Sequence, residues 1–192
     1  MIKLEIPIPE PKIRELRVGD TVLLSGLVVT ARDAGHKLMV EERPRFLDDL
    51  LREGVIYHCG PVVRKEGERW TFVAAGPTTS SREEPYQAKV IESYTVRGVI
   101  GKGGMGAATK EACRKFGAVY FHAVGGCGTS IARAVKEVVA VHKLEEFGTP
   151  EAFWVIRVVD FPVIVTMDTH GNSIHDQVRE QSKQVYERLL ND

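Results

Sequence analysis

The sequence predicts a mixed α/β fold, because apolar, β-branched segments alternate along the chain with segments of helical spacing. Residues 21–31, TVLLSGLVVTA, are typical of a buried strand. Residues 107–116 form a helical segment that Gly117 can end. Some predicted strands follow one another with no helix between them. We therefore expect a mixed sheet, with antiparallel pairs among its strands, and helices packed against it.

The elements follow in order along the chain. Residues 1–13 contain three prolines and are expected to form an extended arm, followed by a single domain at residues 14–192. Asp33 can cap a helix at residues 36–43, and Pro44 ends this helix or opens a second one. Further helices are predicted at residues 83–93, 107–116, 130–147 and 173–190, and further strands at 55–63, 70–75, 96–100, 119–124, 154–158 and 163–167.

The composition excludes several classes of protein. The chain has 192 residues and a formal net charge of zero, so it lacks the basic field of a duplex nucleic-acid binder. It contains neither an apolar run long enough to span a membrane nor a signal peptide's apolar core, and we expect a cytoplasmic protein. Its cysteines are Cys59, Cys113 and Cys127, and no two form a C-x-x-C pair. We expect them to be small core residues rather than ligands of a metal held by this chain alone.

A glycine-rich loop, GKGGMG, lies between a predicted strand and a predicted helix. Gly101, Gly103 and Gly106 match the dinucleotide pattern G-x-G-x-x-G, and Lys102 lies within it. The acidic residue expected about 20 positions later is missing from residues 121–126, which argues against nicotinamide binding. Two interpretations stay open. The helix N-terminus and the lysine can bind another anion, such as a carboxylate, or the loop is a tight turn with a solvated lysine.

Two further junctions between a strand and a helix carry a cation. Arg32 follows the strand at 21–31, and Arg82 follows the hydroxyl-rich loop GPTTSS at 76–81. Each loop alone is also explained by ordinary helix capping. Ligands of α/β sheets bind at the carboxyl ends of strands, and three cations suit a small dianion with two carboxylates. His36 and Lys37 either line this site or form a solvated first turn.

A second glycine-rich loop lies at residues 125–128. It can position a ligand or let a strand and a helix pack closely. We favour packing, with Cys127 in the core. His170 and His175 flank Gly171-Asn172, which is typical of a turn rather than of a metal pair.

These residues together resemble a known family. Arg32-Asp33 with His36-Lys37, the loop GPTTSSR, the lysine of GKGGMG, Gly125-Gly126 and the segment DFPVIV occur in this order. The pattern is similar to the C-terminal domain, or separate β subunit, of iron–sulfur class I hydro-lyases, the class I fumarases and L-tartrate dehydratases. The resemblance covers about residues 14–175, and the G-P-T-T-x-x-R loop is its most specific part.

The resemblance implies a swivelling β/β/α domain that closes over a partner. An α subunit would hold a four-iron four-sulfur cluster through three cysteines, in an assembly of two α and two β subunits or in another hetero-oligomer. Arg32, Arg82 and Lys102 would bind substrate carboxylates, Thr78 would transfer a proton, and Thr79, beside it, would also bind substrate. Gly101 and Gly103 would line the site.

The reaction implied by the resemblance is the reversible hydration of fumarate to L-malate, with L-tartrate dehydration as the alternative. Ser80-Ser81 and Glu83-Glu84 depart from the family's usual residues, which bears on the choice of substrate. The alternatives from other classes are a non-catalytic module that binds an anion or a nucleotide, and a purely structural subunit.

Overall fold

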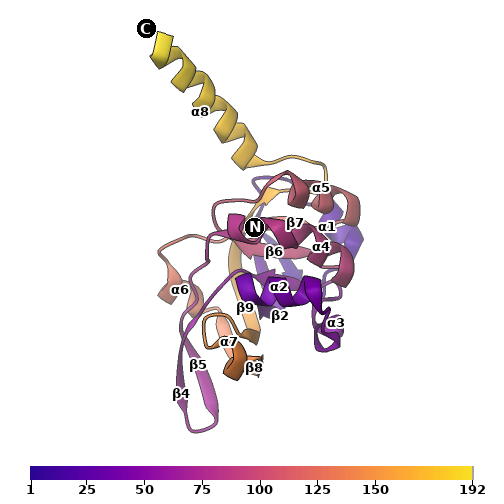
Figure 1. Ribbon diagram of the computed structural model, residues 1–192, viewed down its shortest axis with the longest axis vertical. Coiled ribbons are helices and arrows are strands. Elements are labelled where there is room, and N and C mark those ends of the chain that lie inside the picture. The colour runs from indigo at the N-terminus through magenta and orange to yellow at the C-terminus, as the bar shows by residue number, and fades with distance from the viewer. Residues whose placement is uncertain (192) are drawn as a thin grey trace.

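A computed structural model describes residues 1–191 of the chain and the side chains of residues 1–190. Seven strands form one sheet in the order β1-β2-β3-β6-β7-β9-β8 (Figure 1). Their bounds are β1 Ile2–Glu5, β2 Thr21–Thr30, β3 Val55–Tyr57, β6 Gly98–Gly101, β7 Val119–His122, β8 Val135–His142 and β9 Phe153–Met167. A separate hairpin consists of β4 Val62–Glu66 and β5 Arg69–Ala74. The α-helices are α1 Glu10–Glu15, α2 Asp33–Glu41, α3 Asp48–Leu51, α4 Glu84–Tyr94, α5 Ala107–Phe116, α6 Gly128–Ala132, α7 Leu144–Phe147 and α8 Ile174–Asn191.

The sheet closes on itself through β9. Strands β1, β2, β3, β6 and β7 are parallel neighbours, whereas β9 pairs antiparallel with β2, β7 and β8. Because β9 pairs with both β2 and β7, the strands β2, β3, β6, β7 and β9 form a closed ring. The expected mixed sheet with antiparallel pairs is confirmed. The closure places the carboxyl ends of β2, β3, β6 and β7 at one rim.

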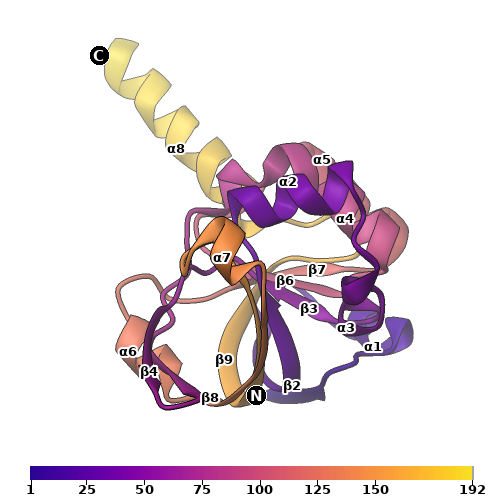
Figure 2. The same cartoon turned by 60° about the horizontal axis from the view of Figure 1, so that its bottom comes forward.

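Two layers of core hold this arrangement. Large side chains inside the ring, among them Tyr57, Phe121 and Trp154, are fully buried. Helices α2, α4 and α5 cover the outer face of β3, β6 and β7, as Figure 2 shows. Val90 of α4 and Cys113 of α5 belong to the buried cluster beneath these helices. Apolar burial on both faces explains why the short parallel strands have no polar alternation.

The helix predicted at residues 130–147 is wrong in its middle. The structure has the short helix α6, then the strand β8, then the short helix α7. The run Val138-Val139-Ala140-Val141 has high strand propensity, and β8 pairs with β9 along most of its length. Tertiary pairing therefore overrides the helical spacing of the flanking residues.

The two strands predicted at 154–158 and 163–167 are one strand, β9. The sequence Asp160-Phe161-Pro162 is typical of a turn, but here it forms a bulge within the strand. Asp160 adopts a positive φ of 50°, and its N–H donates to Ser25 Oγ at 3.1 Å. The register between β2 and β9 shifts at the same place. The predicted strand at 55–63 is likewise split, into β3 and the first strand of the hairpin.

The extended arm expected at residues 1–13 is extended only in part. β1 adds to the sheet beside β2, and α1 begins at Glu10. Ile8 and Ile13 are fully buried. Arg97 is nearly buried and its guanidinium donates to Glu10 Oε2 at 3.0 Å. These apolar contacts and this ion pair hold the segment on the body, which its prolines alone do not predict.

The last helix, α8, points away from the body (Figures 1 and 2). Its first turn contacts the body: His175 Nε2 lies 3.0 Å from Thr166 Oγ1, and Lys110 pairs with Asp176 at 2.6 Å. Beyond Val178 its described side chains are exposed. Among the described residues, none of the helices is both long and apolar enough to cross a bilayer.

Candidate functional site

The carboxyl ends of the parallel strands β3 and β6 lie beside the hydroxyl-rich loop at residues 76–81. Pro77 forms an antiparallel bridge with Cys59, just beyond β3. Thr79 forms a parallel bridge with Lys102, just beyond β6. The loop therefore lies across the ends of two neighbouring strands, and the tertiary structure brings Thr79 next to Lys102.

Backbone hydrogen bonds fix the threonines of this loop. The N–H of Thr78 donates to the carbonyl of His58 at 2.7 Å, and the N–H of Ser80 donates to the carbonyl of Lys102 at 3.1 Å. Thr78 is half-buried and Thr79 is exposed. Both hydroxyl-bearing residues thus lie at the rim of the sheet, within an ordered stretch of backbone.

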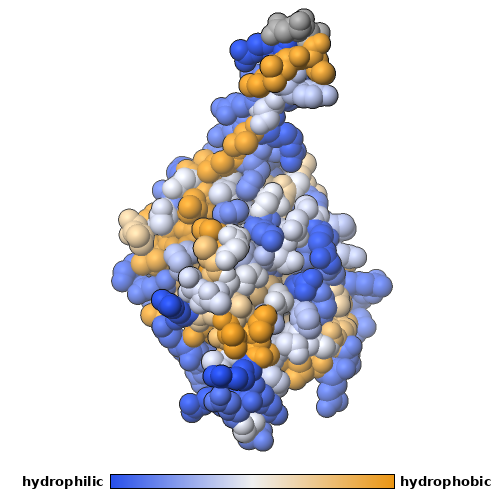
Figure 3. Space-filling model, turned by 90° about the vertical axis from the view of Figure 1, so that its left-hand side faces the viewer, coloured by the Kyte–Doolittle hydropathy of each residue, from blue (hydrophilic) through white to orange (hydrophobic). Residues whose placement is uncertain are grey.

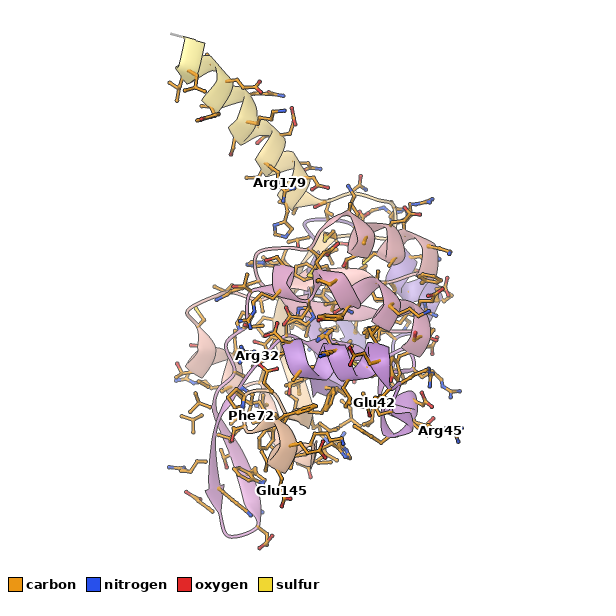
Figure 4. All side chains as sticks on the ribbon, viewed as in Figure 1. Arg32, Glu42, Arg45, Phe72, Glu145 and Arg179 are labelled. Carbon is orange, nitrogen blue, oxygen red and sulfur yellow. The ribbon has the colours of Figure 1, made fainter. Side chains whose placement is uncertain are left out.

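Both predicted arginines already have carboxylate partners. Arg82 forms an ion pair with Asp33, which lies at the start of α2. Arg32 Nε lies 3.4 Å from Glu151 Oε1, and Figure 4 shows Arg32 at the N-terminal end of α2. The pair between Arg82 and Asp33 brings the hydroxyl-rich loop to this end of α2. The hydroxyl-rich loop therefore adjoins both other cation-bearing junctions, that of Arg32 through Asp33 and that of Lys102 through Thr79.

The N-terminus of α5, which the sequence offers to a ligand, is occupied by the chain itself. The Glu84 carboxylate accepts from the backbone N–H groups of Gly106, Ala108 and Thr109 at 2.7, 3.1 and 3.2 Å, and from Thr109 Oγ1 at 2.7 Å. A Cβ on Gly106 would lie 2.6 Å from Glu84 Oε1, so this glycine admits the side chain. The helix end binds an anion, as expected of its unpaired N–H groups, but that anion is Glu84.

The other two glycines of the G-x-G-x-x-G pattern, Gly101 and Gly103, are glycine for different reasons. Gly103 is exposed and adopts a positive φ of 81°, which favours glycine. Gly101 is buried, and a Cβ there would lie 1.8 Å from Ser80 Oγ. Gly103 thus allows the turn beside Lys102. Gly101, which we expected to line the site, instead makes room for a buried hydroxyl.

Glu83 is a buried carboxyl beside the site. From the sequence, it is only a departure from the family's usual residues. It is fully buried, and both of its carboxyl oxygens lack a hydrogen-bond partner among the described residues. Burial, and then the nearby Asp33 charge, raise the pKa of Glu83 from 4.5 to about 7, against the opposing effect of Arg82 and Arg32. Nothing in a local pattern distinguishes it from an ordinary exposed residue at the start of a helix.

His36 lies beneath the site rather than on its surface. It is fully buried, and its Nδ1 lies 2.9 Å from the carbonyl oxygen of Arg32. Its contact with site residues is therefore through the backbone of Arg32. The expectation that His36 lines the site is wrong for this reason.

The cysteines do not form a group. Cys59 is buried inside the ring of strands, and Cys113 is on the buried face of α5. Burial raises the pKa of each thiol to about 12. Cys127, expected in the core, is exposed, because the glycine-rich loop that carries it lies on the surface. Three thiols so separated do not fit an iron–sulfur cluster. Within residues 1–191, no three His, Cys, Asp or Glu side chains gather where they could hold a metal ion.

Comparison with known families identifies the family to which this mixed α/β domain belongs. The family model described as "Fumarase C-terminus" matches residues 1–178. The chain belongs to this family, and the resemblance drawn from its motifs is confirmed.

Two relatives show both names that the family carries. The chain is 48% identical to the "Putative fumarate hydratase class I" of Geobacillus stearothermophilus over 184 residues, which cover 95% of this chain and 35% of that protein. It is 43% identical to the "L(+)-tartrate dehydratase subunit beta" of Escherichia coli (strain K12) over 187 residues, which cover 96% and 90%. The chain thus spans about a third of the first relative and nearly all of the second.

Proposed function

We propose that this chain is the β subunit of a two-subunit iron–sulfur hydro-lyase that interconverts L-malate with fumarate and water. The observation that carries the proposal is the pairing of the Thr78-Thr79 segment against Lys102, with Arg82 and Arg32 on the adjoining loops. Three cations on adjoining loops suit a dianion with two carboxylates. L(+)-tartrate is the second candidate substrate, because the relatives carry both names.

The residues of this chain would bind and orient the dianion. Arg82 offers two parallel N–H donors to a carboxylate, and Lys102 adds a point charge. As the proton leaves the C–H group next to the substrate carboxylate, these cations would stabilise the negative charge that develops on that carboxylate. Thr78 would carry that proton. Because a threonine hydroxyl is a weak base at neutral pH, it needs the nearby cations or a group from the partner.

The partner in this proposal is an α subunit that carries a four-iron four-sulfur cluster. Held by that subunit, the cluster would supply Lewis-acid chemistry for the hydroxyl that leaves as water. The assembly of two α and two β subunits, the closing motion of this domain and the cytoplasmic location stay predictions. Light scattering on the reconstituted complex measures the first of them.

The test is reconstitution with the α subunit under anaerobic conditions, followed by assays of L-malate and L(+)-tartrate dehydration. Thr78→Ala is expected to lower kcat by about 100-fold or more, as loss of a proton-transfer group does. Arg82→Lys is expected to lower kcat/KM by about 10-fold or more, because lysine cannot make the two-point contact. Turnover of neither substrate by the wild-type complex contradicts the proposal.

Matched controls separate chemistry from folding. Thr71→Ala and Arg52→Lys change the same residue types at exposed positions of the hairpin and of the turn after α3, and are expected to leave kcat and KM unchanged. The rival module that only binds an anion or a nucleotide predicts that the isolated chain binds NAD tightly. Calorimetric titration with NAD and with L-malate distinguishes the two.

A further inference from the structure

A chain of buried hydrogen bonds runs beneath the site from α2 to β7. Its five side chains are fully buried: His36, His58, Ser80, Gln87 and Tyr120. The contacts in order are Arg32 O to His36 Nδ1 at 2.9 Å, His36 Nε2 to the Gln87 amide at 2.9 Å, the Gln87 amide to His58 Nε2 at 2.8 Å, His58 Nδ1 to Ser80 Oγ at 2.8 Å, and Tyr120 Oη to Ser80 Oγ at 2.8 Å. Gln87 on α4 is the centre of this chain, since one atom of its amide contacts both imidazoles.

Both ends of this chain of hydrogen bonds contact the backbone of the site. At one end, His36 bonds to the carbonyl of Arg32. At the other end, Ser80 lies next to Thr79 in sequence, and its N–H donates to the Lys102 carbonyl. His58 also accepts the N–H of Thr78 through its own carbonyl. A shift of the central amide would therefore move the substrate-binding loops relative to one another.

The partners of each atom determine where the protons lie. The Arg32 carbonyl can only accept, so His36 Nδ1 carries a proton. Burial lowers the pKa of both His36 and His58, so both rings are neutral at neutral pH. The Nε2 atom of neutral His36 is then an acceptor and requires a donor.

Among the side chains of residues 1–190, the amide nitrogen of Gln87 is the group that meets this requirement. In the orientation with Oε1 towards the rings, that nitrogen is buried without a partner in the described part of the chain. A half-turn of the amide about its Cγ–Cδ bond brings the NH2 group between the rings, where it donates one hydrogen to each Nε2. His58 then also carries its proton on Nδ1 and donates it to Ser80 Oγ.

We propose that Gln87 is a positioning residue: its amide donates to His36 and His58, fixes both as Nδ1–H tautomers, and thereby aligns the Arg32 and Thr78–Ser80 segments for the substrate. The network rests on the contacts above, and its effect on turnover rests on the proposed function. Gly101 leaves room for this network, because any side chain there would displace Ser80 Oγ.

The first test reads the tautomers directly and needs no activity. Nitrogen-15 NMR of the full chain with labelled histidine, assigned through variants at positions 36 and 58, is expected to show Nδ1 protonated and Nε2 unprotonated in both rings at pH 7. Gln87→Glu replaces the donor by a carboxylate that only accepts, and is expected to move a proton onto Nε2 of at least one ring. A protonated Nε2 in either ring of the wild-type chain overturns the proposal.

The second test measures turnover of the reconstituted complex. Gln87→Leu is expected to raise KM for L-malate by about 10-fold or more and to lower kcat, because both loops lose their alignment. His58→Asn keeps a donor near Ser80 and is expected to retain more kcat/KM than His58→Leu. Gln181→Glu on the exposed part of α8 is the control and should change neither constant.

The two tests separate failure of this inference from failure of the proposed function. A complex that turns over neither substrate contradicts the function, while the NMR result still decides the tautomers. An active complex in which Gln87→Leu keeps wild-type KM and kcat overturns the positioning role. If Gln87→Leu does not fold, the isosteric Gln87→Glu and the wild-type NMR spectrum still decide the question.

Discussion

Arg82 and Arg32 bind carboxylates of their own chain, Asp33 and Glu151. In the proposed reaction, a substrate carboxylate would share or replace these partners. The Arg82 side chain is 52% exposed, and an exposed ion pair contributes only about 0–1 kcal/mol, so the exchange costs little.

Glu83 makes the free energy of unfolding depend on pH. Its pKa is raised from 4.5 to about 7, so between these values the folded state keeps a proton that the unfolded state has lost. The Glu83 contribution to the free energy of unfolding therefore falls as pH rises through this window. Glu83→Gln is expected to stabilise the chain at pH 8 and to have little effect at pH 4. The stabilisation is at most about 3 kcal/mol, and screening by solvent lowers it.

Urea unfolding of the wild-type chain and of Glu83→Gln at pH 4 and pH 8 measures this difference. Glu5→Gln, at an exposed position, is the control and should give the same small change at both pH values. Equal effects of Glu83→Gln at pH 4 and pH 8 would show that Glu83 carries no raised pKa.

At the scale of elements, the glycine-rich loop shows how one motif serves several purposes. Gly106 admits the Glu84 carboxylate, Gly103 makes the turn, and Gly101 accommodates Ser80. Glu84 lies at the start of α4 and caps the start of α5, so one carboxylate joins the two helices. Lys102 is left as the charged group of this loop at the rim.

We expect Glu84→Gln to destabilise the chain by about 1–2 kcal/mol. The amide keeps one acceptor oxygen but loses the charge, the second acceptor and the favourable interaction with the positive end of α5. Thermal or chemical unfolding measures the change, with Glu68→Gln at the exposed tip of the hairpin as control. A change within about 0.5 kcal/mol of that control would contradict the capping role.

At the scale of the whole molecule, the closed ring of strands and its helices form the body, while α8 extends beyond it. Figure 3 shows apolar atoms along this helix. The exposed apolar side chains of α8 are Val178, Val185, Tyr186, Leu189 and Leu190. They add nothing to the core of the body.

Removal of residues 179–192 is therefore expected to leave Tm of the remaining chain within about 2 °C of the full chain, since His175 and Asp176 keep their contacts with the body. Removal of residues 174–192 is the comparison and should lower Tm, because those contacts are lost. Differential scanning calorimetry measures both. Loss of the cooperative unfolding transition in the chain that ends at residue 178 would show that α8 stabilises the body.

The sequence by itself determined the family and much of the local structure. The order of its motifs indicated a fumarase-type domain, and the family match confirmed it. Helix α5 spans the predicted residues, and β2 ends within one residue of the predicted strand. These features depend on caps, breakers and periodicity within about 15 neighbouring residues, which a sequence displays directly.

Only the tertiary structure decided which groups meet. Glu84 fills the helix end that appeared open to a ligand, and Gln87 joins His36 to His58 across 51 and 29 positions of sequence. The run that forms β8 is a strand because β9 lies beside it. Hydrogen-bond partners and burial are set by closure of the sheet, which brings together residues far apart in the chain, so no local pattern could predict them.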